Sequence, residues 1–167
     1  QACTREVLLY AKPEERAPII DTFEEVDEYG NARKAYMADD PDWLAGYERM
    51  RETGESTGIV TGVDGLMLEN AMARQVFLEG SFDQSAFATG KYVLAAGADS
   101  SYIRSTPPAG SRITICGREF EIMASIPYES TLLSGADSRQ AQYNITYYLP
   151  HSAFDELFPE HGIRNVA

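Results

Sequence analysis

The feature that most constrains this chain is a β-hairpin predicted over residues 111–126, which read SRITICGREFEIMASI. Two runs of β-branched and aromatic residues flank Gly117-Arg118, and a two-residue loop with glycine first is typical of a type II′ turn. That loop pairs Cys116 with Glu119, Ile115 with Phe120, Thr114 with Glu121 and Ile113 with Ile122. Because side chains alternate along a strand, Ile113, Ile115, Phe120 and Ile122 then share one face, which we expect to lie in the core.

A short apolar run precedes the hairpin. Residues 91–96 read KYVLAA and lie between Gly90 and Gly97, which is typical of a buried strand. Before this run, Asp83 is placed to cap a short helix over QSAFAT, and Gly90 to end it. The predicted order is therefore short helix, buried strand, loop and hairpin.

This order resembles the extracytoplasmic domain of MacB/FtsX-like ABC transporter permeases, in which G-x-F-(D)…F-x-x-G-K-Y-V-(L/I) precedes G-(D/S)-x-(I/V)-x-(I/V)-x-G-x-x-F-x-(I/V)-x-(G/A)-x-(I/V). The matching residues are Gly80, Phe82, Asp83, Phe87, Gly90, Lys91, Tyr92, Val93, Leu94, Gly110, Ile113, Ile115, Gly117, Phe120, Ile122, Ala124 and Ile126. The resemblance extends to IVTGVDGLMLEN upstream and to NITYYLPHSAFDELFPEHGI downstream, so it covers residues 59–163.

The resemblance implies a domain between two membrane helices of a permease, on the extracytoplasmic face of the cell membrane. Its partners would be a cytoplasmic ATPase subunit and either a second permease copy or an accessory protein. Transported substrates in the family include peptides, lipoproteins and antimicrobial compounds. The family also implies two lobes, one of βαβ type and one β-rich, and no catalytic groups in the domain itself.

The elements predicted from the pattern fit an α+β fold with two such lobes. We expect the α/β lobe to cover 1–79, with 163–167 as a candidate completion and its second half missing from the chain, and the β-rich lobe to cover 80–162. In the first lobe we expect strands at 6–11, 31–38 and 57–63. A helix should start at Pro18, with Ile19, Phe23 and Val26 inward, and a second should run from Asp40-Pro41 to Gly54, with Trp43, Tyr47 and Met50 inward. A third helix is expected at 65–79, with Leu68, Met72 and Val76 inward.

The second lobe is expected to end with a strand at 143–149 and a helix at 152–158. Its long loops, 97–110 and 127–142, are where we expect partner contacts. A hinge is expected at the lobe junction, 79–83. On the 143–149 strand, we expect Tyr143 and Tyr147 to face the core and Tyr148 to face a binding surface.

Charge and hydropathy narrow the possible partners. The net charge of −12 and pI near 4.5 argue against nucleic acid and anionic membrane surfaces, which require clustered Lys and Arg. No apolar run reaches the roughly 20 residues that span a bilayer. Residues 1–10 lack a basic flank and a long apolar stretch, so no signal peptide is predicted, and on the family reading the membrane helices lie outside this sequence.

No catalytic, cofactor-binding or metal-ligating residues are predicted. His151 and His161 do not form an H-E-x-x-H pattern, and Gly62 and Gly65 do not form a G-x-G-x-x-G fingerprint. A Walker A motif is absent, so ATP hydrolysis would reside in a separate subunit. Cys3 and Cys116 are interpreted as two free thiols rather than a disulfide.

Two groups of acids have structural interpretations. Asp39, Asp40 and Asp42 are interpreted as helix-capping residues rather than a calcium site, because the EF-hand spacing is absent. The run Glu24, Glu25, Asp27 and Glu28 is interpreted as a solvated helix face and only secondarily as an ionic contact surface.

Two other functions stay open. One is a secreted or surface module that binds a peptide or small ligand through the long loops. The other is an enzyme whose site is assembled from dispersed residues, which would require a deep pocket with convergent carboxylates or a histidine.

Overall fold

The computed structural model describes residues 3–63, 77, 79–97, 107–127 and 145–160. Its strands are β1 (Cys3–Tyr10), β2 (Glu55–Val63), β3 (Glu79–Gly80), β4 (Tyr92–Gly97), β5 (Arg112–Ile115), β6 (Arg118–Pro127) and β7 (Thr146–Pro150). Its helices are α1 (Pro13–Glu24), the 3₁₀ helix η1 (Arg33–Met37), α2 (Pro41–Thr53), α4 (Gln84–Phe87) and α6 (His151–Leu157). The predicted helix at 65–79 falls almost entirely outside the described residues, and Glu79 belongs to β3.

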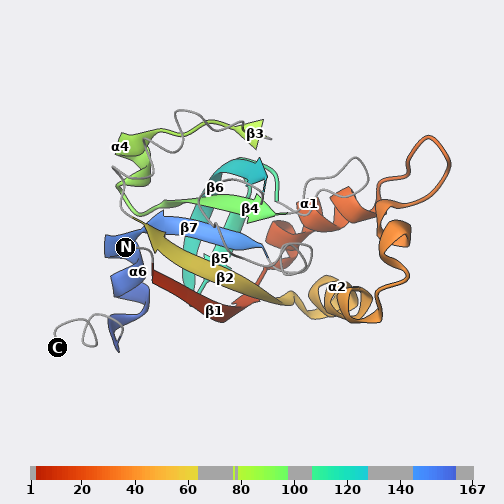
Figure 1. Ribbon diagram of the computed structural model, residues 1–167, viewed down its shortest axis with the longest axis horizontal. Helices are drawn as coiled ribbons and strands as arrows, with labels where there is room; N and C mark the ends of the chain where they lie inside the picture. Colours follow the sequence, from red (N-terminus) through yellow and green to blue (C-terminus); the bar gives the residue numbers. More distant parts are fainter. Residues whose placement is uncertain (1–2, 64–76, 78, 98–106, 128–144, 161–167) are drawn as a thin grey trace.

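The described strands form one mixed sheet in the order β1-β2-β7-β4-β6-β3, with β5 paired to β6. The pairs β2–β7 and β4–β6 are parallel, whereas β1–β2, β4–β7, β3–β6 and β5–β6 are antiparallel. Because β1 also approaches β5, the sheet curls into a nearly closed, barrel-like shape. Figure 1 shows α1 and α2 at one end of the sheet and α6 at the other. The fold is α+β, as predicted, and the described elements do not resolve two lobes.

The hairpin is confirmed, but its predicted register is wrong. The loop is Cys116-Gly117, because Ile115 pairs with Arg118 and Ile113 with Phe120. Both loop residues have positive φ, 48° and 80°, which a type I′ turn requires and a type II′ turn does not. The pairing is shifted by two residues along one strand, so each side chain keeps its face. The four core-facing residues, Ile113, Ile115, Phe120 and Ile122, are therefore buried as expected.

The predicted strand at 31–38 is wrong, since this segment contains the 3₁₀ helix η1. The helical turn directs Met37 into an apolar cluster with Trp43 and Tyr47. It also places Lys34 2.7 Å from Glu24, at the end of α1. These contacts outweigh the weak alternation in the sequence, because a strand would turn neighbouring side chains to opposite faces.

Helix starts follow their caps. In α2, the Asp40 Oδ1 accepts a hydrogen bond from the Trp43 amide (3.0 Å), and Gly54 ends the helix with φ of 80°, both as predicted. Helix α1 begins at Pro13, ahead of the expected Pro18. Its start is fixed by Glu15, whose Oε2 accepts from the Lys12 amide (2.9 Å), so the residues just before the expected start form the first turn of the helix.

Three apolar clusters hold the described residues together. The largest lies between the sheet and α6 and includes Val60, Phe120, Leu149 and Phe154. A second contains Phe87 of α4, with side chains of β4 and β6. Tyr148 belongs to this second cluster and is buried, so its predicted place on a binding surface is wrong. The third cluster joins α1, η1 and α2 through Phe23, Met37, Trp43, Tyr47 and Met50.

Candidate functional site

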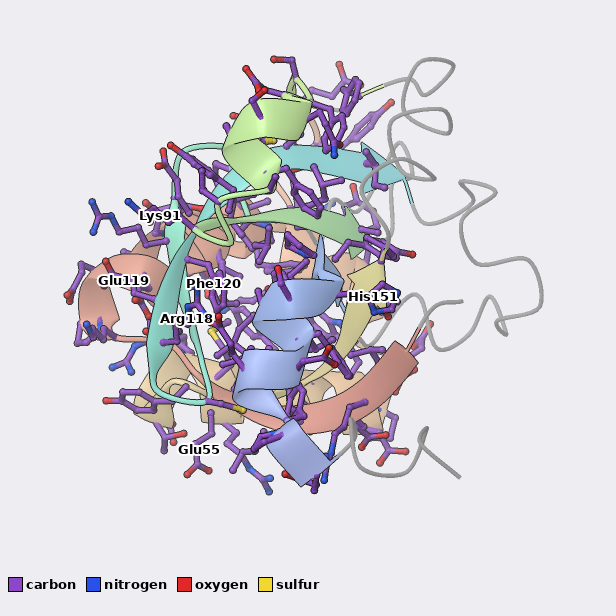
Figure 2. The ribbon with its side chains drawn as sticks, turned by 90° about the vertical axis from the view of Figure 1, so that its left-hand side faces the viewer. Glu55, Lys91, Arg118, Glu119, Phe120 and His151 are labelled. Carbon is purple, nitrogen blue, oxygen red and sulfur yellow. The ribbon has the colours of Figure 1, made fainter. Side chains whose placement is uncertain are left out.

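Of the two histidines, the described residues include His151. His151 is half-buried at the start of α6, and His161 lies outside the described residues. Figure 2 shows His151 well apart from Glu55 and Glu119. Within the described ranges, no group of three or more His, Cys, Asp or Glu side chains is close enough together to hold a metal ion.

The acidic groups have structural partners. Asp40 caps α2, and Asp42 lies in the first turn, where a carboxylate is favoured by the helix dipole. The run from Glu24 is not the predicted solvated helix face, because α1 ends at Glu24. Glu25 pairs with Arg33 (3.0 Å), and Asp27 accepts hydrogen bonds from the amides of Tyr29 and Asn31. This run therefore fixes the connection from α1 to η1.

Of the cysteines and glycines considered above as candidate site residues, the structure describes the surroundings of Cys116 and Gly62. Cys116 is an exposed free thiol in the hairpin loop, as expected. Gly62 lies against α6, since a Cβ there would be 2.8 Å from the Phe154 ring. Cys3 belongs to β1, and its side chain is outside the description. Tyr143, Gly65 and most of both long loops are also outside the described residues.

The structure instead places a cavity of about 310 Å³ between α2 and the adjoining ends of β1 and β2. Apolar side chains dominate its lining, which includes Leu9, Ile19, Phe23, Trp43, Tyr47, Met50, Ile113, Ile145 and Tyr147. The volume lies at the lower end of the range for small-molecule sites. Its volume and its apolar lining therefore suit a small apolar ligand.

Three aromatic rings in contact form the wall on the helical side. The rings of Trp43 and Tyr47 are nearly parallel, with centroids 5.3 Å apart. Phe23 of α1 meets Trp43 edge-on at 5.1 Å and Tyr47 at 5.3 Å. Edge-to-face and stacked arrangements are the favoured geometries of aromatic pairs, so these contacts stabilise the wall.

A partly buried hydrogen bond anchors the same wall. The Tyr47 hydroxyl donates to Glu24 Oε1 (2.9 Å), which also accepts from Lys34 Nζ (2.7 Å). The hydrogen bond from Lys34, followed by that from Tyr47, lowers the pKa of Glu24 below its ordinary value. Burial, and then the same carboxylate, raises the pKa of Tyr47, so the hydroxyl stays protonated and keeps donating at neutral pH.

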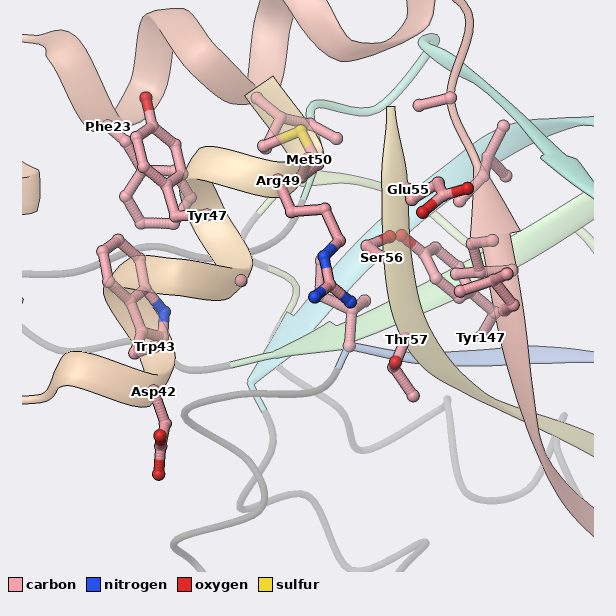
Figure 3. A pocket seen from close by; sticks show the side chains of 17 residues that line it. Phe23, Asp42, Trp43, Tyr47, Arg49, Met50, Glu55, Ser56, Thr57 and Tyr147 are labelled. Carbon is pink, nitrogen blue, oxygen red and sulfur yellow. The ribbon is translucent and has the colours of Figure 1, made fainter. Parts of the chain in front are cut away.

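The cavity also has a charged group at its edge. Arg49 extends from α2 toward Ser56 and Thr57 of β2, as Figure 3 shows. In the part of the chain that is described, its guanidinium takes part in no ion pair or hydrogen bond. Asp42 and Glu55 also line the cavity, but neither carboxylate points toward this guanidinium in Figure 3. An apolar chamber with a cation at its edge can bind an apolar molecule.

The sequence does not predict this cavity. The stripe Trp43, Tyr47 and Met50 is predicted as an inward face, but the space between this face and the sheet is not. The only available signal was Gly46, a glycine inside an otherwise helical pattern, which indicates a packing or functional reason for a missing side chain.

The fold is similar to those of two solved extracytoplasmic transporter domains. The periplasmic region of MacB from Actinobacillus actinomycetemcomitans aligns with a TM-score of 0.41 and 11% identity over 62% of this chain. The chain spans 42% of that structure's length. The extracellular domain of the noncanonic ABC-type transporter YknZ from Gram-positive bacteria aligns with a TM-score of 0.42 and 13% identity, covering 93% of this chain and 78% of that one.

The sequence matches no protein-family model. It also has no significant match among curated proteins. Among the described residues, no helix is long and apolar enough to cross a membrane.

Proposed function

We propose that this chain is the extracytoplasmic domain of an ABC transporter permease of the MacB/FtsX-like type. A cytoplasmic ATPase subunit would supply the energy, and the domain would couple its motion to export or extraction of peptides, lipoproteins or antimicrobial compounds. A second permease copy or an accessory protein would complete the assembly. The hinge at 79–83 and the two-lobe division at 79/80 belong to the same proposal.

The observation that carries this proposal is where the family-like residues lie in the fold. The four motif glycines, Gly80, Gly90, Gly110 and Gly117, all have φ between 74° and 86°. Such angles are costly for residues with a Cβ, so the motif specifies backbone geometry at these positions. Most of its apolar residues are buried, namely Phe87, Val93, Leu94, Ile113, Ile115, Phe120, Ile122, Ala124 and Ile126, and Phe82 is partly buried. The motif therefore coincides with the positions that define this sheet, which supports a shared fold, and the function follows by analogy with that fold.

Labelling of Cys116 tests the extracytoplasmic location. This thiol is exposed in the hairpin loop, so a membrane-impermeant maleimide can reach it. In cells that express the full-length protein with Cys3→Ser, we expect labelling of intact cells, or of spheroplasts where an outer membrane is present. The matched variant Cys3→Ser/Cys116→Ser gives the background. Labelling only after the inner membrane is permeabilised would contradict the proposal.

The full-length reading frame provides a second test. We expect apolar segments of roughly 20 residues on both sides of this sequence and a neighbouring ATPase gene. If no such segment adjoins either end, the permease proposal is wrong. The cavity beside α2 would then favour the alternative, a secreted or surface module that binds a small ligand or peptide.

A further inference from the structure

We propose that the cavity between α2 and strands β1 and β2 binds an apolar molecule that carries a carboxylate. The apolar part would lie against Trp43, Tyr47 and Met50, and the carboxylate would face Arg49. This inference goes beyond the transporter proposal and does not depend on it, because both the cavity and the guanidinium lie within the described chain.

The apolar part of the ligand follows from the lining. Burial of a saturated chain or ring against such a wall contributes about 25 cal/mol per Å² of apolar surface removed from water. The apolar lining also continues to the surface at Leu8, a large side chain that is 65% exposed. A single exposed leucine is ordinary, but one that adjoins an apolar cavity extends the surface available to a ligand.

Arg49 is the reason to expect a carboxylate on the ligand. A guanidinium presents donors in a planar fork that matches a carboxylate, and such charge-assisted pairs are stronger than neutral hydrogen bonds. In this acidic chain, most of the other described arginines have acidic partners, as Arg51 does with Glu48 (2.7 Å) and Arg118 with Glu156, whereas Arg16 donates to the Ala11 carbonyl. Arg49 has no such partner in the described ranges and points across the cavity in Figure 3. A ligand carboxylate would complete its ion pair.

The chain carries a built-in reporter for this site. Trp43 is the only tryptophan in the sequence, and its ring lines the cavity. A molecule that enters the cavity changes the surroundings of the indole, so its fluorescence reports binding at this site. Three probes with a ten-carbon chain and different head groups separate the two parts of the proposal: decanoate, decanol and decyltrimethylammonium. The two ionic probes are used below their micelle concentrations, and decanol below its solubility limit.

We expect decanoate to change the emission of Trp43 with saturation, decanol to bind more weakly, and decyltrimethylammonium to bind most weakly. Arg49→Gln should weaken the affinity for decanoate about tenfold and leave the affinity for decanol unchanged, because only the charged pair is lost. Arg51→Gln is the matched control on the same helix, since its side chain pairs with Glu48 and does not line the cavity. It should leave both affinities unchanged.

A second variant tests the cavity itself. Gly46 lines the cavity, and a Cβ added there has no atom within 4 Å, so Gly46→Leu should fold and place its side chain over the opening. We expect loss of decanoate and decanol binding with an unchanged far-ultraviolet circular dichroism spectrum. Three outcomes would each overturn the proposal. The cationic probe could bind with the same affinity as decanoate, Arg49→Gln could leave decanoate binding unaffected, or a folded Gly46→Leu variant could bind the probes unaltered. So would a Trp43 spectrum unmoved by all three probes.

Discussion

At the scale of single residues, two glycines of the same helix have opposite requirements. Gly46 lies inside α2 with open space where a Cβ would be, whereas Gly54 ends the helix with φ of +80°. A Cβ on Gly54 would also be 2.2 Å from the carbonyl oxygen of Ala11. Gly54 is therefore required by the backbone, and Gly46 is not.

The first prediction uses this matched pair. Gly46→Ala should raise the free energy of unfolding by about 0.5–1 kcal/mol, because alanine loses less conformational entropy in a helix. Gly54→Ala should lower it by more than about 1 kcal/mol, since the substitution adds both backbone strain and a close contact. Urea denaturation of the two variants measures the difference. Destabilisation by Gly46→Ala would mean that this glycine has a backbone role absent from the structure.

A second residue-scale prediction concerns pH. Because hydrogen bonds from Lys34 and Tyr47 lower the pKa of Glu24 in the folded state, the unfolded state binds more protons near the ordinary value of 4.5. Glu24 therefore contributes stability above that pH, and the contribution is lost as the pH falls through its folded pKa. Lys34→Met should raise the pKa of Glu24, measured by NMR titration of its side-chain carboxyl carbon.

Lys91→Met is the control for this titration, because Lys91 takes no part in the Glu24 pair. It should leave the carboxyl titration unchanged. If Glu24 titrates at its ordinary value in the unmodified chain, the pair with Lys34 contributes nothing in solution.

At the scale of elements, the hairpin loop has an unusual residue. Cys116 has φ of 48°, a region that few residues other than glycine, asparagine and aspartate occupy readily. Asparagine followed by glycine is the preferred pair in a type I′ turn. Cys116→Asn should therefore stabilise the chain by a few tenths to about 1 kcal/mol, and Cys116→Val should destabilise it, because a β-branched residue strains this angle.

Thermal unfolding of these two variants provides the measurement. Both side chains are exposed at this position, so packing differences are small and the backbone effect dominates. Equal midpoints for Asn and Val would indicate that the loop relaxes to a different turn in solution.

How far the sequence predicts these elements depends on how local their causes are. Helix α2 was predictable because Asp40, Pro41 and Gly54 carry its start and end within the segment itself. The loop register of the hairpin was not predictable, because Gly117 fits either turn type and a cysteine at position 116 does not indicate a positive φ. The strand prediction for residues 31–38 was wrong because the conformation of this segment depends on the packing of Met37 against α2. The cavity could not be predicted, since its walls come from segments as distant as Leu9 and Tyr147.

At the scale of the whole molecule, β7 connects the two halves of the sequence. It pairs in parallel with β2, from the segment before residue 80, and antiparallel with β4, from the segment after it. Leu149 of β7 is fully buried in the largest apolar cluster, which draws side chains from both segments. We therefore expect the described elements to unfold together, even if the lobes proposed at 79/80 move as units in a full-length transporter.

The corresponding prediction compares two probes during denaturation. Trp43 fluorescence reports on residues before 80, and hydrogen exchange of the β6 amides reports on residues after 80. The two transitions should coincide, as in a cooperative unit.

Leu149→Ala should shift both transitions by the same amount, about 2–5 kcal/mol in the free energy of unfolding, because it leaves a cavity between the two segments. Leu8→Ala, at a side chain that is 65% exposed, is the matched control and should change the free energy of unfolding by less than about 0.5 kcal/mol. Separate transitions, of which Leu149→Ala moves only one, would instead establish the two lobes as independent folding units.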